Sequence, residues 1–394
     1  MSEHEHRPVF PSTILLGLQY LTSFNTFYEM LVGWIFLNLT LFVLWRLLCQ
    51  TFQDGKWVII PIAWMTYSFT QYEILLDGVG SIMFYLTLLM FVSTIYFLNK
   101  IKYSPISIVP AIICSFVASF SEINGLSIWI VGFLVFTNFS RLKLLIPYAI
   151  SGITAFVLFF NGWTYQQHTS QGLTQILVNH PFGFLSFFLA YLGNSIRLRG
   201  AENVGIDAFS FSISLGIIVV GIFIVAILLY RHFRIGQNSN QTVTPWLQIS
   251  IFALLTDFIT AIGRIPSYGI EYALSSRYVA FSNLFLDGTL VISLMVLFYI
   301  KKNTSTTIRR KFLKGSFIVL MVLVGSDIGL GNVVGWLGGS MFYERHIVGT
   351  SCLMNFESAS DDCLQNLYWD ASTIRERAKF LQEQCLGPFA STCK

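Results

Sequence analysis

Charged residues are scarce in this chain. Only 11% of its 394 residues are Asp, Glu, Lys or Arg, whereas 54% are hydrophobic. A soluble globular domain carries roughly 25% charged residues, so this scarcity excludes an ordinary soluble protein. The net charge of +4 does not indicate a nucleic-acid partner either. The Lys and Arg residues stand in short gaps beside apolar runs, where membrane topology explains them.

Several well-known catalytic signatures are also missing. The sequence has no Walker signature, no G-x-S-x-G motif and no H-E-x-x-H motif, which excludes the enzyme classes defined by those motifs. A glycine-rich run does occur at 325–339, but no Lys-Ser or Lys-Thr follows it. We interpret this run as a flexible outer connector. No cofactor is evident from the sequence.

What the sequence has instead is a succession of apolar runs, each of about the length that a bilayer core requires. We therefore predict an all-α, multi-pass membrane protein with about ten transmembrane helices. The predicted spans are Tyr28–Cys49, Trp57–Tyr72, Val79–Leu98, Pro105–Phe120, Gly125–Phe139, Leu144–Gly162, Ile206–Tyr230, Trp246–Ile262, Val279–Ile300 and Phe312–Gly325.

The charges between these spans alternate along the chain. One set of gaps is basic and includes Lys100, Arg141, Arg231 and Lys301, whereas the other set is acidic or mixed. Cytoplasmic loops of membrane proteins carry an excess of Lys and Arg. We therefore predict that the basic gaps face the cytoplasm and that the protein lies in the inner (plasma) membrane. Both chain termini are then extracytoplasmic.

Two short apolar segments do not fit as spans. Pro181–Gly193 is too short to cross simply, and both of its neighbours belong to the outer set, so we predict a re-entrant or interfacial helix. Pro11–Thr22 precedes the first full span and is predicted to be an outer interfacial helix. The polar outer loop Trp163–His180 either contributes to a site or simply covers helix ends.

The composition becomes polar after about residue 331. We therefore divide the chain into an outer N-terminal segment (1–27), a transmembrane domain (28–330) and a small extracytoplasmic tail domain (331–394). Within the tail, Thr373–Glu376 has the pattern of a capping box. A helix is expected to follow, with one apolar face and an end near Gly387. That face holds Ile374, Ala378 and Leu381.

Four of the six cysteines lie in this tail, at Cys352, Cys363, Cys385 and Cys393. An oxidising compartment permits disulfides, and four cysteines allow three pairings. We favour Cys352–Cys363, with Cys385–Cys393 as the second pair. A zinc site is the alternative, but only His346 is nearby and no C-x-x-C pair occurs.

Ionisable groups at the outer membrane edge are the candidates for chemistry, because charge is costly there. Arg264 and Arg277 bracket one short outer loop, and two guanidinium groups suit a phosphate. The alternative is that each pairs with a local acid such as Glu271 or with a lipid headgroup. Glu122, in a tight outer turn, is either a general base or sugar-binding group or a cap of the next helix. The turn pattern favours the cap.

A second charged group, Glu5, His6 and Arg7, stands just ahead of the predicted interfacial helix. A histidine flanked by carboxylates can shuttle protons. An N-terminal tail is usually mobile, however. From the residues alone, this group is not predicted to be functional.

Several stretches, taken in order, resemble one bacterial family of polytopic membrane proteins, mostly of unknown function and often grouped with GT-C type glycosyltransferases. The matching stretches are Glu5–Pro11, Gln71–Glu73, Ala118–Gly125, Tyr191–Gly193, Gly263–Arg264, Ala273–Tyr278 and the tail pattern from Cys352 through Cys363 to Ala378. The resemblance implies a GT-C-like fold and transfer of a sugar from a polyprenyl-phosphate donor at the outer face.

The resemblance also implies site residues and partners. The catalytic candidates are Glu5 and Glu122. The candidates for holding the lipid phosphate are His6, Arg7, Arg264 and Arg277. The expected partners are membrane lipid and the polyprenyl-phosphate-linked sugar. A divalent metal is a further option, since some GT-C enzymes use one, although no ligand set is visible here.

The chain departs from the family at its start. In the family, the Glu-His-Arg-Pro stretch follows a transmembrane helix and an outer loop that holds the catalytic acid. Here the stretch begins at Glu5. The departure leaves three alternatives: a truncated gene product, a misplaced start, or an inactive relative. Glu5 is the nearest remaining acid.

Two other functions stay open. A transporter or flippase of lipid-linked or small solutes is favoured by Asp257 and Asp287, which lie inside predicted spans, although no internal repeat is visible. A non-catalytic scaffold or assembly protein would use the tail for docking. The glycosyltransferase hypothesis predicts that Glu122, Arg264 and Arg277 converge at an outer site, whereas transport predicts a central pathway.

Overall fold

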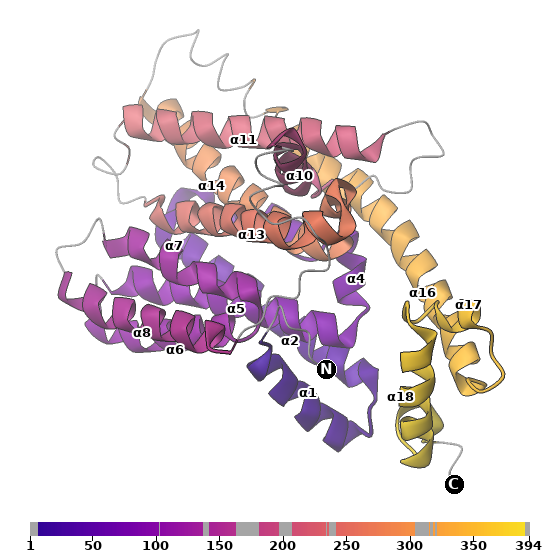
Figure 1. The fold of residues 1–394 in the computed structure, drawn as a ribbon. Helices are drawn as coiled ribbons and strands as arrows, with labels where there is room; N and C mark the ends of the chain where they lie inside the picture. The colour runs from indigo at the N-terminus through magenta and orange to yellow at the C-terminus, as the bar shows by residue number, and fades with distance from the viewer. Residues whose placement is uncertain are drawn as a thin grey trace.

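The computed structural model describes residues 7–101, 103–136, 142–162, 181–196, 207–233, 235, 242–303, 315, 318–319 and 321–390. These residues form helices and turns, and no strand occurs among them. The long helices form one bundle. In Figure 1, α11 (Ala208–His232) lies on one side, with α13 (Thr244–Tyr268) and α14 (Val279–Asn303) beneath it. The predicted all-α fold is confirmed.

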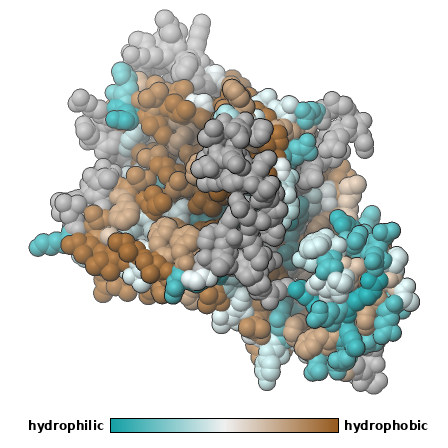
Figure 2. Space-filling model, in the orientation of Figure 1, coloured by the Kyte–Doolittle hydropathy of each residue, from teal (hydrophilic) through white to brown (hydrophobic). Residues whose placement is uncertain are grey.

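Seven helices of the described residues are long and apolar enough to cross a membrane. Besides α11, α13 and α14, they are α2 (Thr26–Thr51), α5 (Gly78–Lys100), α8 (Leu142–Phe160) and a last helix, Met321–Met354, which contains η8 (Asp327–Gly331) and α16 (Asn332–Met354). The protein is therefore an integral, multi-pass membrane protein. Figure 2 shows apolar side chains over much of the bundle surface, as expected of helices that face lipid.

Two of the predicted spans are shorter helices. Pro105–Phe120 contains a 3-10 turn followed by α6 (Ile108–Ser119), and Gly125–Phe139 contains α7 (Ser127–Phe136). They pack with α5 and α8 on the far side of the bundle from α11 (Figure 1). Neither reaches the ~20 residues of a simple span, so the count of about ten transmembrane helices stays a prediction.

The predicted span Trp57–Tyr72 is not one continuous helix, because the helix breaks within it. α3 (Ile59–Thr66) ends before a 3-10 turn, η2 (Phe69–Gln71), and the short α4 (Tyr72–Leu75) follows. At the break, the Ser68 hydroxyl accepts a hydrogen bond from the Thr70 amide, and Gln71 Nε2 donates to the Thr66 carbonyl. Side-chain bonds of this kind replace the helical pattern.

The short segment at Pro181–Gly193 forms a helix, α10, with the predicted bounds. It packs closely on α11 through a pair of glycines. A methyl group on Gly193 would overlap the Ser212 carbonyl, and one on Gly216 would overlap the Leu189 carbonyl. Small residues allow membrane helices to approach in this way. The other short segment, α1 (Val9–Thr22), also forms a helix.

The glycine-rich run 325–339 is helical, so its interpretation as a flexible connector is wrong. A methyl group on Gly335 would overlap the backbone of Phe69 and Thr70 in η2. The glycines therefore permit close helix packing. As a result, the last helix continues from the bundle into the tail, as the diagonal α16 in Figure 1 shows.

The end of the chain has its own small core. It consists of Cys352, Phe356, Leu364, Ala371, Ile374, Ala378 and Phe389. They come from α16 and the turn after it, from α17 (Asp361–Leu364), from α18 (Ala371–Glu383) and from the final turn. This part carries a hydrophilic surface in Figure 2. Ile374 and Ala378 are buried and Leu381 packs against them, as predicted.

The start of α18 differs from the predicted capping box. Asp370, three residues before Thr373, is the N-cap, and its carboxylate accepts a hydrogen bond from the Ser372 amide. Aspartate is among the strongest N-cap residues. The helix ends at Glu383, a turn before the predicted end near Gly387.

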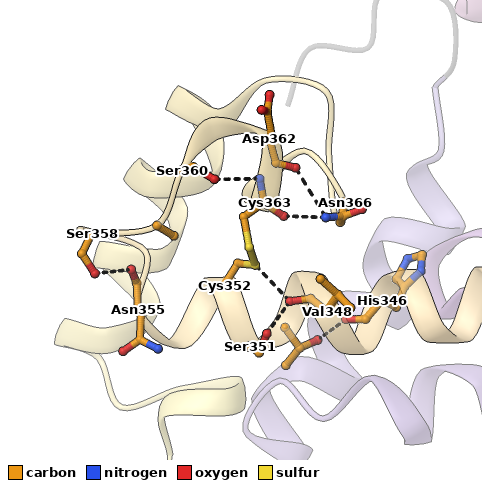
Figure 3. The surroundings of a disulfide bond; sticks show 12 residues. His346, Val348, Ser351, Cys352, Asn355, Ser358, Ser360, Asp362, Cys363 and Asn366 are labelled. Carbon is orange, nitrogen blue, oxygen red and sulfur yellow. Dashed lines mark hydrogen bonds between the residues drawn. A yellow bond between two sulfur atoms is a disulfide. The ribbon is translucent and has the colours of Figure 1, made fainter.

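The predicted Cys352–Cys363 disulfide is present (Figure 3), with a Cα–Cα distance of 5.9 Å. It joins the end of α16 to α17. The two sulfur atoms are bonded to each other, so the zinc alternative is wrong for this pair. Cys385 is also disulfide-bonded. Its predicted partner, Cys393, lies outside the described residues, so the second pairing stays a prediction.

Candidate functional site

Glu122 lies in a tight turn between α6 and the 3-10 helix η4 (Ile123–Leu126), outside both apolar helices. The turn is closed by two backbone bonds, from the Glu122 amide to the Ala118 carbonyl (3.3 Å) and from the Gly125 amide to the Glu122 carbonyl (2.9 Å). Gly125 is required there, because a methyl group would overlap the Ala118 carbonyl. Glu122 as a whole is only 3% exposed.

Glu122 stands at the N-cap position of η4, as the turn pattern predicts, but no side-chain hydrogen bond caps this helix. Instead, Oε1 accepts a bond of 2.8 Å from Asn124 Nδ2, and Oε2 has no hydrogen-bond partner among the described residues. Burial raises the pKa of Glu122 to about 8, against the opposing effects of the Asn124 bond and the Arg264 charge.

Arg264 lies near the C-terminal end of α13, and its positive charge lowers the pKa of Glu122. Its guanidinium lies 5.7 Å from the ring centroid of Tyr268. Two buried tyrosines, Tyr191 and Tyr278, also belong to this group. Their rings stack, with the ring centroids 5.2 Å apart. The charges of Glu122, Arg264 and Arg277 all act on the Tyr278 hydroxyl. We call Glu122, Tyr191, Arg264 and Tyr278 the Glu122 cluster.

Arg277 stands beside this cluster in a separate ion pair. Its Nε lies 3.3 Å from Glu73 Oε2, and the Ser275 hydroxyl donates to the same oxygen at 3.1 Å. The Ser276 hydroxyl donates to the Thr70 carbonyl at 2.7 Å. Together these bonds fix η7 (Ser276–Tyr278) against α4. The acid that pairs with Arg277 is therefore distant in sequence, not the local Glu271.

The N-terminal segment reaches the same region. The Phe10 amide donates to the Phe120 carbonyl (3.3 Å), two residues before Glu122. Arg7 donates to the Leu158 carbonyl at 3.0 Å and to the Asn161 carbonyl at the end of α8. Its guanidinium therefore stabilises a helix C-terminus, a role not predicted for it. Glu5 and His6 lie outside the described residues.

An apolar groove of about 670 Å³ lies between α2, the broken α3–α4 segment and α16. Its walls include Trp34, Tyr72, Leu75, Trp336 and Tyr343. The volume falls within the range of small-molecule sites, which are lined mainly by apolar and aromatic groups. α4 borders both this groove and the ion pair, because Tyr72 and Leu75 line the groove while Glu73 meets Arg277.

Among the residues that the structure describes, three acids inside helices are at most 1% exposed. Asp257 in α13 and Asp287 in α14 lie where the sequence predicts them, inside apolar spans. Asp327, in the π-helical η8, was missed, because the sequence analysis placed it in a connector. π-helical segments frequently occur at functional sites, so a glycine-flanked acid within an apolar run is a signal that could have found it.

Comparisons with protein-family models, with curated proteins and with solved structures give no match to this chain. The resemblance to GT-C enzymes therefore stays a prediction.

Proposed function

We propose that the protein is a GT-C type glycosyltransferase of the inner membrane, with both termini extracytoplasmic, that takes a sugar from a polyprenyl-phosphate donor. The observation that carries this proposal is the stacked pair Tyr191 and Tyr278, whose neighbourhood includes the charges of the buried Glu122, of Arg264 and of the Arg277–Glu73 ion pair. The sequence-based hypothesis requires Glu122, Arg264 and Arg277 to meet.

Glu122 is the proposed general base. Its Oε2 has no hydrogen-bond partner among the described residues, so it is available to accept the proton of an acceptor hydroxyl. A pKa of about 8 is close to the pH at which such a base works best. Arg264 stabilises the ionised carboxylate that accepts the proton.

Arg277 is the proposed phosphate contact. Its side chain is 45% exposed although it is paired with Glu73, so a ligand can reach it. Arginine matches the geometry of a phosphate with a planar fork of donors. Glu73 and Ser275 act as positioning residues for this guanidinium.

The apolar groove is the proposed place of the isoprenoid chain. Its aromatic walls suit a long apolar chain, and α4 links the groove to the ion pair. A lipid with its chain in the groove would bring its headgroup to the end of α4. The apolar chain of the donor would thus bind in the groove and its charged phosphate at the ion pair.

The test uses the purified full chain in proteoliposomes with radiolabelled polyprenyl-phosphate glucose, mannose, galactose or arabinose. A total cell-envelope extract supplies the acceptor hydroxyls, and release of polyprenyl phosphate is measured. We expect wild-type protein to release it from at least one donor. Glu122→Gln should reduce the rate by about 10²-fold or more, the usual size of a general-base effect. Glu271→Gln, which changes an exposed acid in the neighbouring turn, is the matched control.

Two results would reject the proposal. One is a wild-type chain that releases nothing from any of the four donors. The other is a Glu122→Gln variant as active as the Glu271→Gln control.

Transport of a lipid-linked or small solute is the second candidate, favoured by a separate observation. The chain breaks between α3 and α4 beside the buried Asp287 and Asp327, and broken helices commonly form the sites of transporters. Movement of a fluorescent polyprenyl phosphate between leaflets, insensitive to Glu122→Gln, would favour transport over transfer.

A further inference from the structure

A very small cavity lies among α2, the α3–α4 break and α14. Its volume is about 20 Å³, enough for a single water molecule or ion of similar size. Most of its lining is apolar, but five polar side chains also face it. These are Thr40, Thr66, Gln71, Asn283 and Asp287.

Three of these side chains present an oxygen that no donor of the described residues satisfies: Gln71 Oε1, Asn283 Oδ1 and Asp287 Oδ1. The residues are 1%, 3% and 1% exposed respectively. A buried acceptor without a partner is destabilising, so three of them around one cavity require an explanation.

The amide orientations at the cavity are fixed by their other bonds. Gln71 Nε2 donates to the Thr66 carbonyl at 2.6 Å, and Asn283 Nδ2 donates to the Met65 carbonyl at 2.7 Å. A carbonyl oxygen can only accept, so each NH₂ group must face its carbonyl. The amide oxygens, not the nitrogens, are therefore left for the cavity.

A further buried acid lies close to the cavity. Asp327 is fully buried in η8, and neither of its carboxylate oxygens has a partner among the described residues. η8 in turn packs against α3. No basic side chain borders the cavity within the described residues.

We propose that this cavity binds a dehydrated Na⁺ ion, held by Asp287, Gln71 and Asn283, with Asp327 adding negative charge nearby. Ligands that are all oxygen select a hard cation. Ca²⁺ takes 6–8 oxygen ligands and Mg²⁺ retains several waters, for which this cavity has no room. The ion would join the α3–α4 break to α14. This site is independent of the proposed transferase site.

The experiment uses the purified full chain in nanodiscs. NaCl is exchanged for choline chloride or KCl at constant ionic strength and pH. Thermal unfolding is followed by tryptophan fluorescence, and radioactive Na⁺ binding by equilibrium dialysis. We expect the unfolding midpoint to rise saturably with Na⁺ alone, and one Na⁺ to bind per chain.

The variants locate the ion. Asp287→Asn should weaken Na⁺ binding on the order of tenfold or more, because it removes a ligand charge. Gln71→Met, which removes Oε1 but keeps the side-chain length, should also weaken it, and serves if Asp287→Asn does not fold. Asp257→Asn, a buried acid that does not line the cavity, should leave Na⁺ binding unchanged.

Three outcomes would overturn the proposal. The first is a wild-type midpoint that responds equally to Na⁺, K⁺ and choline. The second is Na⁺ binding that survives both Asp287→Asn and Gln71→Met. The third is stability that follows pH but not Na⁺, which would assign protons or water to the cavity instead.

Discussion

Glu73 and Arg277 are 204 residues apart in the sequence and form an ion pair of 3.3 Å between Oε2 and Nε. The pair joins the broken-helix segment to the turn that begins α14. The arginine side chain is 45% exposed, so solvent screens the attraction. The pair therefore serves to hold the guanidinium in place more than to stabilise the fold.

Replacement of Arg277 by glutamine should separate these two effects. We expect the free energy of unfolding to fall by less than ~1 kcal/mol, as for other exposed pairs. Binding of polyprenyl phosphate, measured by native mass spectrometry, should fall by about tenfold or more, since a charged phosphate contact is lost. Arg231→Gln, at the exposed end of α11, is the control. Equal binding by the two variants would argue against a phosphate contact at Arg277.

Glu122 should make stability depend on pH in a defined direction. Burial raises its pKa from 4.5 to about 8 in the folded chain. Between these values the unfolded chain loses the proton while the folded chain keeps it, so folded stability falls as pH rises from about 4.5 to about 8. Glu122→Gln lacks this loss. We expect the thermal midpoint of the variant, relative to that of wild type, to rise from about pH 5 to about pH 8. Above about pH 8 the difference between the two midpoints should stay constant. Parallel pH profiles would contradict the buried state of the carboxyl.

The rate of transfer should follow the same group in the opposite sense. The base form of Glu122 accumulates as pH rises toward about 8, so the rate in proteoliposomes should increase over this range. Arg264→Gln removes the charge that lowers the pKa. The rise should then move to higher pH, a shift that a merely structural arginine would not produce.

Gly335 should be intolerant of even one added methyl group. Gly335→Ala forces α16 away from the backbone of Phe69 and Thr70, and overpacking of this kind typically costs 1–3 kcal/mol. Gly329→Ala is the matched control, because a methyl group there meets nothing within 4 Å. Thermal unfolding in detergent compares the two. A midpoint for Gly335→Ala as high as that of Gly329→Ala would show that the close contact is absent.

Loss of the Cys352–Cys363 disulfide should affect the tail alone. In the chain-entropy account, a bond across 11 residues contributes about 3 kcal/mol. Cys352→Ser with Cys363→Ser should expose the small core to limited proteolysis, while the bundle keeps its thermal midpoint. Cys49→Ser, at a free cysteine in α2, is the control. A fall in the midpoint of the bundle would show that the tail supports the membrane domain.

The long helices could be predicted from the sequence because apolar length alone defines them. α2, α5, α11, α13 and α14 lie within a few residues of the predicted spans. The break at Ser68 could not be predicted, since it depends on side-chain bonds to the backbone. The glycines in the run 325–339 predicted a flexible connector. In the structure their small size allows the helix to pack closely against its neighbours.

The candidate site was predictable only in part. Alternating charge was enough to expect Glu122, Arg264 and Arg277 on one side of the membrane. In the structure the Arg264 charge lowers the pKa of Glu122, while Arg277 pairs with Glu73. The pairing of Arg277 with Glu73 and the inward turn of Glu122 depend on contacts between distant segments. Composition and spacing contain no information on such contacts.

The last helix has one further consequence. Its 34 residues extend about 51 Å at the helical rise of 1.5 Å per residue, whereas the hydrocarbon core of a bilayer is ~30 Å thick. The excess extends beyond the length of the hydrocarbon core and carries the disulfide-bonded tail. The Gly387 amide of the tail also donates to the Ser23 carbonyl, between α1 and α2, at 3.0 Å. The tail is therefore held at two points, and a binding partner has to meet it at a set position beside the N-terminal helices.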